Sequence, residues 1–284
     1  MAELIDGKAL AAREKEKLIQ VAARLPRRPG LAVILVGNDP ASRVYVNNKE
    51  KDCEQCGFLS YEYKLPEETS EEEVLDMIGY LNGNPKVDGI LVQMPLPAHI
   101  DEEKIINAIS PDKDVDAFHP FNVGRMVIGD PVFLPCTPAG ILEMLRAYDI
   151  SVAGKRCVVV GRSNIVGKPM ALLLMQNDGT VTTCHTKTQN LAEITREADI
   201  LVCAAGHRNL ITGDMVKEGV VVIDVAMNRT EEGKLRGDVS FDEVEKKASY
   251  ITPVPGGVGP MTRLVLLRNI LTAAERHLGL ERTN

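Results

Sequence analysis

A tyrosine and a lysine, Tyr45 and Lys49, lie four residues apart in a segment that follows a long apolar run. That run, residues 31–37, is typical of a buried strand, and residues four apart on a following helix share one face. The helix would begin near the carboxyl end of the strand, where open α/β sheets bind ligands. A partly desolvated lysine there can exchange protons as an acid–base catalyst, although most lysines are solvated surface groups. Both interpretations of Lys49 fit the sequence.

The polar side chain of Gln93 closes a second apolar run, residues 89–93, directly before the segment Met94-Pro95-Leu96-Pro97. A glutamine at the end of an apolar strand is a candidate ligand-binding group, because its amide can both donate and accept hydrogen bonds. The alternative is a residue at the rim of the sheet that bonds to the following loop.

Three carboxylates alternate in Asp112-Lys113-Asp114-Val115-Asp116, as at the start of a calcium-binding loop. The sixth position of such a loop requires glycine and the twelfth requires glutamate, but the chain has Ala117 and Val123 there. These carboxylates therefore form either a solvated acidic loop or a set of hydrogen-bond acceptors for the N–H groups of a substrate.

The segment Gly161-Arg162-Ser163-Asn164-Ile165-Val166-Gly167 lies between a predicted strand at residues 156–160 and a predicted helix that Lys168 and Pro169 open. Gly161 permits a tight turn, and the small Ser163 lets the backbone approach a pyrophosphate that faces the helix N-terminus. The match to G-x-G-x-x-G is imperfect, since the last glycine comes one residue late. A serine-hydrolase elbow is excluded, because Ile165 occupies its second glycine position.

The next predicted strand, residues 180–184, indicates which nucleotide is bound. NAD sites usually carry an acid after this strand to bind the ribose hydroxyls. Here the chain continues His185-Thr186-Lys187, and Arg162 supplies a planar cation suited to phosphate. The combination favours NADP over NAD.

A third glycine-rich segment, residues 255–259, precedes the last predicted helix. Its three glycines, Gly256, Gly257 and Gly259, allow a backbone to approach a flat ligand closely. A simple entry into a helix is the alternative, although one glycine would suffice for that.

Strand-like and helix-like segments alternate along all 284 residues, which predicts an α/β fold with mostly parallel sheets. The boundary between two domains is expected at about residues 134–150, where Thr137 as N-cap and Pro138 as first helical residue would begin a helix. A further long helix is expected from Pro260 to Leu278.

The composition narrows the function classes. A net charge of −7 argues against nucleic acid as the main partner, and no apolar run is long enough to span a membrane. The N-terminus has neither a basic region nor an apolar one, so we expect a cytoplasmic protein. Six cysteines include Cys53 and Cys56 in C-x-x-C spacing, but a second ligand pair is absent, so packing is favoured over zinc and no metal is expected.

These segments, in this order, resemble the bifunctional methylenetetrahydrofolate dehydrogenase/methenyltetrahydrofolate cyclohydrolase family over essentially the whole chain. No single motif is decisive, but the ordered set is highly specific. The segments that carry the resemblance are Ser42-x-x-Tyr45-Val46-x-x-Lys49, residues 92–97, residues 112–116, residues 135–138, residues 161–169 and residues 253–262.

The resemblance implies an N-terminal α/β folate-binding catalytic domain at residues 1–140, completed by a C-terminal helix at 260–284. It also implies a Rossmann NADP-binding domain at 141–259. Lys49 would be the central catalytic residue, held or tuned by Gln93, with Tyr45 stacking on the aminobenzoyl group and Asp116 accepting hydrogen bonds from the pterin. The remaining folate contacts would be Val92, Met94, Pro255, Gly256, Gly257, Val258 and Gly259. The NADP contacts would be Gly161, Arg162, Ser163, Thr186 and Met227. Such enzymes are usually cytosolic homodimers that pair through their nucleotide domains.

Several positions depart from the family pattern without removing a catalytic group. Ala117 and Ala226 stand where glycine is usual, Thr186 replaces a serine, Met227 an isoleucine, and Arg263 an apolar residue. Two rival functions remain: a dehydrogenase that releases the methenyl product, and a non-catalytic nucleotide-binding regulator.

Overall fold

The computed structural model describes residues 1–230 and 232–280, which form two compact units. Unit 1 comprises residues 1–13 and 135–264, and unit 2 comprises residues 14–134 and 265–284. Two helices, α1 (Gly7–Ala22) and α10 (Val258–His277), each contribute residues to both units. This division differs from the expected ranges at the N-terminus, where residues 1–13 group with unit 1 because β1 (Glu3–Leu4) joins its sheet.

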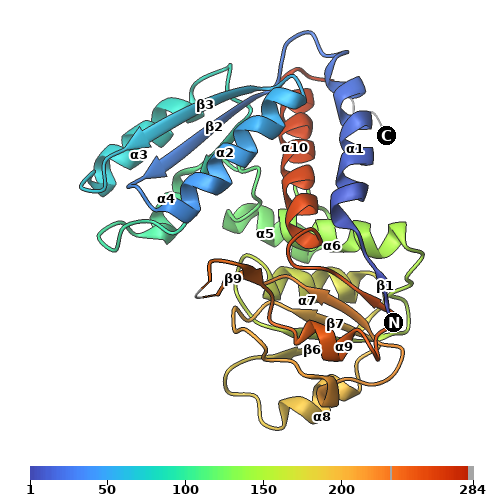
Figure 1. The fold of residues 1–284 in the computed structure, drawn as a ribbon. Coiled ribbons are helices and arrows are strands. Elements are labelled where there is room, and N and C mark those ends of the chain that lie inside the picture. Colours follow the sequence, from blue (N-terminus) through green and yellow to red (C-terminus); the bar gives the residue numbers. More distant parts are fainter. Residues whose placement is uncertain (231, 281–284) are drawn as a thin grey trace. The chain divides into compact units, whose positions relative to one another are not determined.

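Unit 1 contains a six-stranded, entirely parallel sheet in the order β1-β11-β8-β7-β5-β6. Figure 1 labels β1, β6 and β7 of this sheet. The strand order reverses at β5, because β6 lies on one side of it and β7 on the other. Open α/β sheets bind ligands at such a reversal, outside the carboxyl ends of the strands. The strands after β1 are β5 (Arg156–Val160), β6 (Thr180–Cys184), β7 (Ile200–Cys203), β8 (Val221–Asp224) and β11 (Tyr250–Ile251).

Helices α7 and α8 follow β5 and β6, and a short antiparallel pair of strands lies apart from the main sheet. The core of the unit is formed by apolar side chains, many of them from β5, β7 and β8, and it includes Cys184 and Cys203. The remaining elements are α6 (Cys136–Ala147), α7 (Gly167–Gln176), α8 (Leu191–Arg196), the 3-10 turn η1 (Gly213–Met215), α9 (Phe241–Val244), β9 (Asn228–Arg229) and β10 (Leu235–Arg236).

Unit 2 contains a three-stranded parallel sheet in the order β3-β2-β4, so the strand order reverses at β2. One face of the sheet packs against α3 and α4, and the core there includes Ala32, Ile34, Val74 and Ile78. The elements are β2 (Gly30–Val36), α2 (Pro40–Gln55), β3 (Leu59–Leu65), α3 (Glu71–Asn82), β4 (Gly89–Val92), α4 (Glu102–Ala108) and α5 (Pro120–Val127).

The C-terminal part of α10 is bonded into unit 2. Asn269 donates to the carbonyls of Val115 and Leu134 at 2.8 and 3.0 Å. The imidazole of His277 lies 2.9 Å from the buried carboxylate of Asp88, which also accepts two hydrogen bonds from Arg27. A buried ion pair of this kind requires all its partners, because an unpaired charge inside a protein is costly.

The prediction of an α/β fold with mostly parallel sheets is confirmed, but two helices begin at other residues than predicted. Helix α6 begins at Cys136 with Pro135 as its N-cap, and Thr137 instead bonds its hydroxyl to Thr262 at 2.9 Å. Helix α7 begins at Gly167, one residue before Lys168.

The last helix spans Val258–His277, within two residues of the predicted Pro260 to Leu278. The longer range 260–284 includes residues 281–284, which lie outside the described residues.

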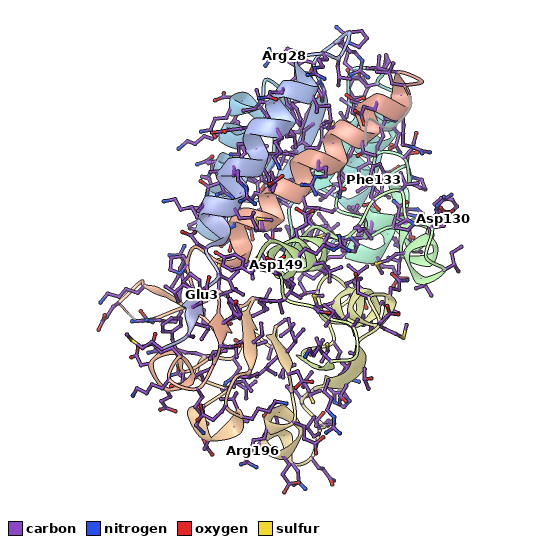
Figure 2. The ribbon with its side chains drawn as sticks, turned by 90° about the vertical axis from the view of Figure 1, so that its right-hand side faces the viewer. Glu3, Arg28, Asp130, Phe133, Asp149 and Arg196 are labelled. Atoms are coloured by element: carbon purple, nitrogen blue, oxygen red, sulfur yellow. The ribbon has the colours of Figure 1, made fainter. Side chains whose placement is uncertain are left out.

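All six cysteines are buried and free, as the packing interpretation requires. Figure 2 shows the side chains of the chain, with the fully buried Phe133 and the exposed Asp130 of unit 2 labelled. Within residues 1–230 and 232–280, no helix is long and apolar enough to cross a membrane.

Candidate functional site

Unit 2 places Lys49 and Gln93 together at the point where the strand order of its sheet reverses. Helix α2 follows β2, and Asp39 caps it by accepting the backbone N–H of Ser42 at 2.7 Å. Gln93 follows β4, and its backbone N–H bonds to the carbonyl of Ile34 on β2 at 2.9 Å. The ammonium of Lys49 then donates to Oε1 of Gln93 at 3.2 Å.

The amide of Gln93 is held in one orientation. Its Nε2 donates to the carbonyl of Met94 at 2.7 Å, so Oε1 is the atom that faces Lys49. Lys49 is half-buried, whereas Tyr45, one helical turn earlier, has 38% of its surface exposed. The lysine is therefore positioned by a specific partner. A solvated surface lysine would have no such partner.

The three carboxylates of residues 112–116 have different surroundings. Asp112 bonds to the hydroxyl of Ser110 and lies 3.4 Å from His277. Asp114 is buried and accepts the N–H groups of Phe118 and His119 and the amide of Asn122, and burial raises its pKa. These two aspartates hold the loop together, and Asp116 is half-buried.

The position of Asp116 follows from the sheet. Residues 113–115 run parallel to β4, with a bridge between Ile90 and Asp114 and a hydrogen bond of 2.8 Å from Ile90 N–H to the carbonyl of Lys113. Asp116 therefore comes two residues past this bridge, in the direction of the carboxyl end of β4. Val92 at that end is buried, and Met94 is half-buried.

Unit 1 contains the nucleotide turn in the predicted strand–turn–helix setting. Gly161 has φ of 127°, and a Cβ there would come 2.3 Å from the carbonyl oxygen of Ala204. A Cβ on Gly167 would come 2.2 Å from the carbonyl oxygen of Gly161. The late glycine thus performs the packing role of the third glycine of G-x-G-x-x-G, since only glycine lets the helix approach the turn.

Ser163 and Arg162 have separate roles in this turn. The hydroxyl of Ser163 accepts the N–H groups of Val166 and Gly167 at 3.2 and 3.3 Å, so it caps α7 from the preceding turn. Arg162 is exposed. A free guanidinium beside a helix N-terminus fits a phosphate group, which both would attract.

The end of β6 lies beside the turn. Val160 pairs with Cys184, and the N–H of Gly161 donates to the carbonyl of Cys184 at 2.9 Å. The following residues form a compact turn, in which His185 N–H bonds to the hydroxyl of Thr188 at 2.8 Å. Thr186 is exposed in that turn, two residues after Cys184, the strand end that accepts the N–H of Gly161.

Met227 and the glycine-rich segment follow other strands of the same sheet. Met227 comes after β8 and has 40% of its surface exposed, whereas Ala226 is nearly buried. Pro255 is exposed, and Val258 begins α10.

Two of the three glycines near Pro255 are required by the fold itself. Gly256 has φ of 109°, and a Cβ on Gly257 would come 2.7 Å from the carbonyl oxygen of Pro253. Gly259 has open space around it, so it is the glycine that a ligand could explain.

Sequence reasoning missed two buried carboxylates of unit 1, Asp224 and Asp238. Asp224 accepts the N–H groups of Asp238 and Val239 at 2.9 and 3.0 Å. Asp224 ends the apolar run Val220-Val221-Val222-Ile223, which is the same signal that drew attention to Gln93.

The ionisation of Asp224 yields a prediction for stability. Burial, with a smaller contribution from Asp238, raises its pKa from 3.8 to about 7. The folded chain therefore holds this proton more tightly than the unfolded chain. The resulting stabilisation is fully present below pH 3.8 and is lost as the pH rises through 7. Between about pH 5 and pH 8 the loss should be about 2 to 3 kcal/mol.

Urea unfolding at several pH values in this range gives the free energy of unfolding of the chain and of Asp224→Asn, in which residue 224 cannot titrate. The loss is the difference between the two proteins in how steeply this free energy depends on pH. The variant should show a flatter dependence on pH. Equal slopes would exclude Asp224 as the titrating group.

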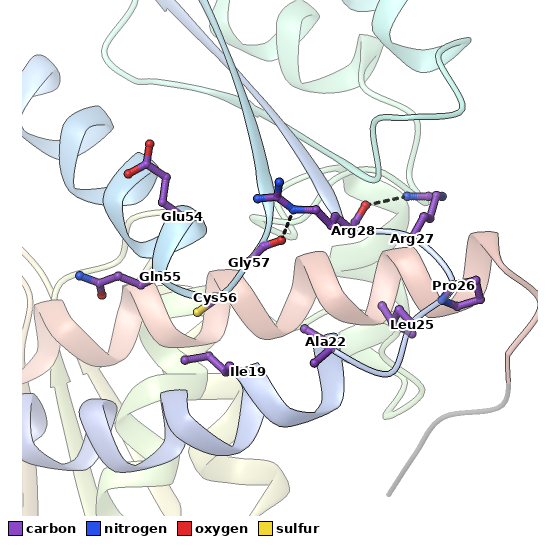
Figure 3. A pocket seen from close by; sticks show the side chains of 11 residues that line it. Ile19, Ala22, Leu25, Pro26, Arg27, Arg28, Glu54, Gln55, Cys56 and Gly57 are labelled. Carbon is purple, nitrogen blue, oxygen red and sulfur yellow. Dashed lines mark hydrogen bonds between the residues drawn. The ribbon is translucent and has the colours of Figure 1, made fainter.

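A cavity in unit 2 lies apart from the predicted site residues, and no metal-binding cluster is found among the described residues. In unit 2, a cavity of about 420 Å³ is lined by the end of α1, the following loop and the end of α2, including Ile19, Arg28 and Cys56 (Figure 3). It contains none of the residues predicted for the site. Over the described ranges, residues 1–230 and 232–280, no group of three or more His, Cys, Asp or Glu side chains could hold a metal ion.

Two family models match the chain. A tetrahydrofolate dehydrogenase/cyclohydrolase catalytic-domain model matches residues 5–116, and the corresponding NAD(P)-binding-domain model matches residues 135–278. The bifunctional protein FolD of Acetivibrio thermocellus is 56% identical over 277 residues, covering 96% of this chain and 97% of that protein.

Solved structures are similar over the same extent. The bifunctional methylenetetrahydrofolate dehydrogenase/cyclohydrolase of Campylobacter jejuni superposes with a TM-score of 0.96 at 51% identity, covering 97% of this chain and 99% of that one. The Trypanosoma brucei methylenetetrahydrofolate dehydrogenase-cyclohydrolase, complexed with NADP and an inhibitor, has a TM-score of 0.94 at 40% identity and covers 98% of each chain.

Proposed function

This chain belongs to the tetrahydrofolate dehydrogenase/cyclohydrolase family, and from that premise we propose which of its residues carry out each reaction. It oxidises 5,10-methylenetetrahydrofolate to 5,10-methenyltetrahydrofolate with NADP, and it then hydrolyses that product to 10-formyltetrahydrofolate. The observation that carries the assignment of roles is the hydrogen bond from Lys49 to Gln93, because it holds a proton-exchanging group where a parallel sheet binds ligands.

Lys49 serves the hydrolytic step. Water adds to the cationic methenyl carbon and loses a proton, and the ring nitrogen that leaves this carbon takes up a proton as the ring opens. One amine can accept the first proton and return it to the nitrogen. The second water proton leaves to solvent as the formyl C=O forms, so one proton is released overall as the cation becomes a neutral product. Gln93 keeps the amine in place through its Oε1, whose orientation the bond from Nε2 to Met94 maintains.

The substrate contacts in unit 2 follow from exposure and chemistry. Tyr45 presents a partly exposed ring that can stack on the aminobenzoyl group. Asp116 is a carboxylate that can accept the N–H groups of the pterin, and Val92 and Met94 add apolar and backbone contacts beside Gln93. Within unit 1, we assign a ligand-binding role to the segment from Pro255 to Gly259, with Gly257 and Val258 shaping the backbone and Gly256 and Gly259 leaving it uncovered.

The NADP residues fit their group. Gly161 and Gly167 let the turn pack closely on Ala204 and on the start of α7, since a Cβ on either would strike a carbonyl oxygen. Ser163 caps the adjoining helix, and Arg162 is an exposed cation. When bound, NADP supplies the acceptor for the hydride of the methylene carbon. Arg162 and Thr186 would hold its phosphate-bearing ribose, and Met227 would contact the nicotinamide half. The dehydrogenase step mainly requires this alignment, since no proton has to be moved.

A single assay tests the function. With methylenetetrahydrofolate and NADP, methenyl absorbance should rise together with NADPH and then decay as the product is hydrolysed. Accumulation of methenyl product without decay would indicate the dehydrogenase that releases it. Binding of NADP with no turnover would indicate the non-catalytic regulator.

We expect the chain to act as a cytoplasmic homodimer that pairs through unit 1. Strand β6 forms an edge of the six-stranded sheet, and Thr180, Thr182 and Thr183 on it are exposed. An edge strand offers a row of N–H and C=O groups to a second copy. Light scattering should give twice the mass of one chain, and the mass of a single chain would reject the dimer.

A further inference from the structure

The carboxylate of Asp238 is completely buried and is surrounded by N–H donors. Its Oδ2 accepts the backbone N–H groups of Ala205 and Gly206 at 2.7 and 3.0 Å. Its Oδ1 accepts the backbone N–H of His207 at 2.7 Å and the side-chain amide of Asn228 at 3.0 Å. Taking a carboxylate out of water costs several kcal/mol unless such donors replace the water. Four donors on two oxygens meet this requirement.

The four donors come from two loops. Residues 204–207 follow β7, and residues 225–228 follow β8, so both loops lie at the carboxyl edge of the sheet. The first loop also contacts the nucleotide turn, since Ala204 is the residue that a Cβ on Gly161 would strike. The second loop contains Met227, directly before Asn228. Asp238 therefore ties together the two loops that adjoin the proposed cofactor position.

The backbone at Asp238 is held in turn by a second carboxylate, that of Asp224. Asp224 at the end of β8 accepts the N–H groups of Asp238 and Val239, and a Cβ on Gly237 would come 1.8 Å from Oδ2 of Asp224. The backbone N–H of Asp224 in turn donates to the hydroxyl of Thr252 at 2.7 Å. The chain at residues 237–239 is thus bonded to the rigid end of a central strand.

We propose that Asp238 is a positioning residue of the dehydrogenase reaction, which holds the loops after β7 and β8 in the shape that receives the nicotinamide half of NADP. This role rests on the proposed placement of the cofactor in unit 1. Asp238 does not touch the reacting atoms; it acts through the backbone of residues 205–207 and through Asn228. The cyclohydrolase reaction, which we assign to Lys49 in unit 2, does not depend on it.

The test is Asp238→Asn, assayed separately for both activities. The amide group introduces N–H donors opposite N–H donors, so the loops lose part of their shape while the side chain keeps its size. The KM for NADP should rise about tenfold or more. The deuterium isotope effect on hydride transfer should change. Cyclohydrolase activity, measured on methenyltetrahydrofolate without NADP, should stay within about twofold.

Two further variants keep the test decisive. Asp242→Asn removes an exposed carboxylate of the same unit and should change neither activity. Asn228→Ala removes one donor of the four and should raise the KM for NADP less than Asp238→Asn does. If Asp238→Asn does not fold, the KM for NADP of Asn228→Ala tests the proposal in its place.

A parallel fall of both activities with no change in KM or isotope effect would overturn the proposal and leave Asp238 a purely structural group. Absence of dehydrogenase activity in the unmodified chain would instead contradict the proposed function.

Discussion

Lys49→Met should lower the cyclohydrolase rate by about a hundredfold or more while the chain stays folded, because a positioned acid–base group typically contributes a factor of 10² to 10⁴. Methionine preserves the length and apolar stem of the side chain but cannot carry a proton or donate to Gln93. The dehydrogenase reaction moves a hydride and requires alignment, so it should fall less. Hydrolysis of methenyltetrahydrofolate, followed by its absorbance, measures the first effect.

The matched control is Lys51→Met, two residues further along α2, where the lysine is exposed. It removes the same charge from the same helix and should leave hydrolysis unchanged. If Lys49→Met retained cyclohydrolase activity, the role proposed for Lys49 would be wrong. If both variants lost it equally, the charge of the helix and not the position of Lys49 would be responsible.

Arg162→Ala should raise the KM for NADP about 10- to 100-fold and alter that for NAD much less. A hydrogen bond to a charged group contributes about 1.5 to 3 kcal/mol, and only NADP carries the extra phosphate that the guanidinium would bind. The comparison of kcat/KM for the two nucleotides in the same variant isolates this contribution.

Arg156→Ala is the control for this experiment. Arg156 lies at the opposite end of β5 from the nucleotide turn, and it forms an exposed ion pair with Glu197 at 2.9 Å. Its removal should affect neither nucleotide, because exposed pairs contribute little. Equal changes in the KM of NADP and NAD on Arg162→Ala would refute the assignment of Arg162 to the phosphate.

The strands and helices that carry the candidate site could be predicted because their signals are local. The apolar runs before Gly37, Gln93 and Gly161 correspond to β2, β4 and β5 within one residue at each end. Strands buried on both faces require continuous apolar residues, and that requirement is visible in any short window of sequence. The ends of helices were less predictable. Thr137 could have capped α6, but its hydroxyl is engaged by Thr262, which is 125 residues away.

The amino-acid sequence by itself determined the fold class, the strand–turn–helix unit around Gly161 and the set of polar residues from which the site is built, because residue type and spacing encode them. Only the tertiary structure decided how those residues are used. It showed that Asp112 and Asp114 bond within their own loop or to nearby side chains, and it gave the late Gly167 its packing role. It also revealed Asp238 as the acceptor for two loops. These outcomes depend on which backbone N–H groups and carbonyls come within about 3 Å of one another, and the chain brings such groups together only when it folds.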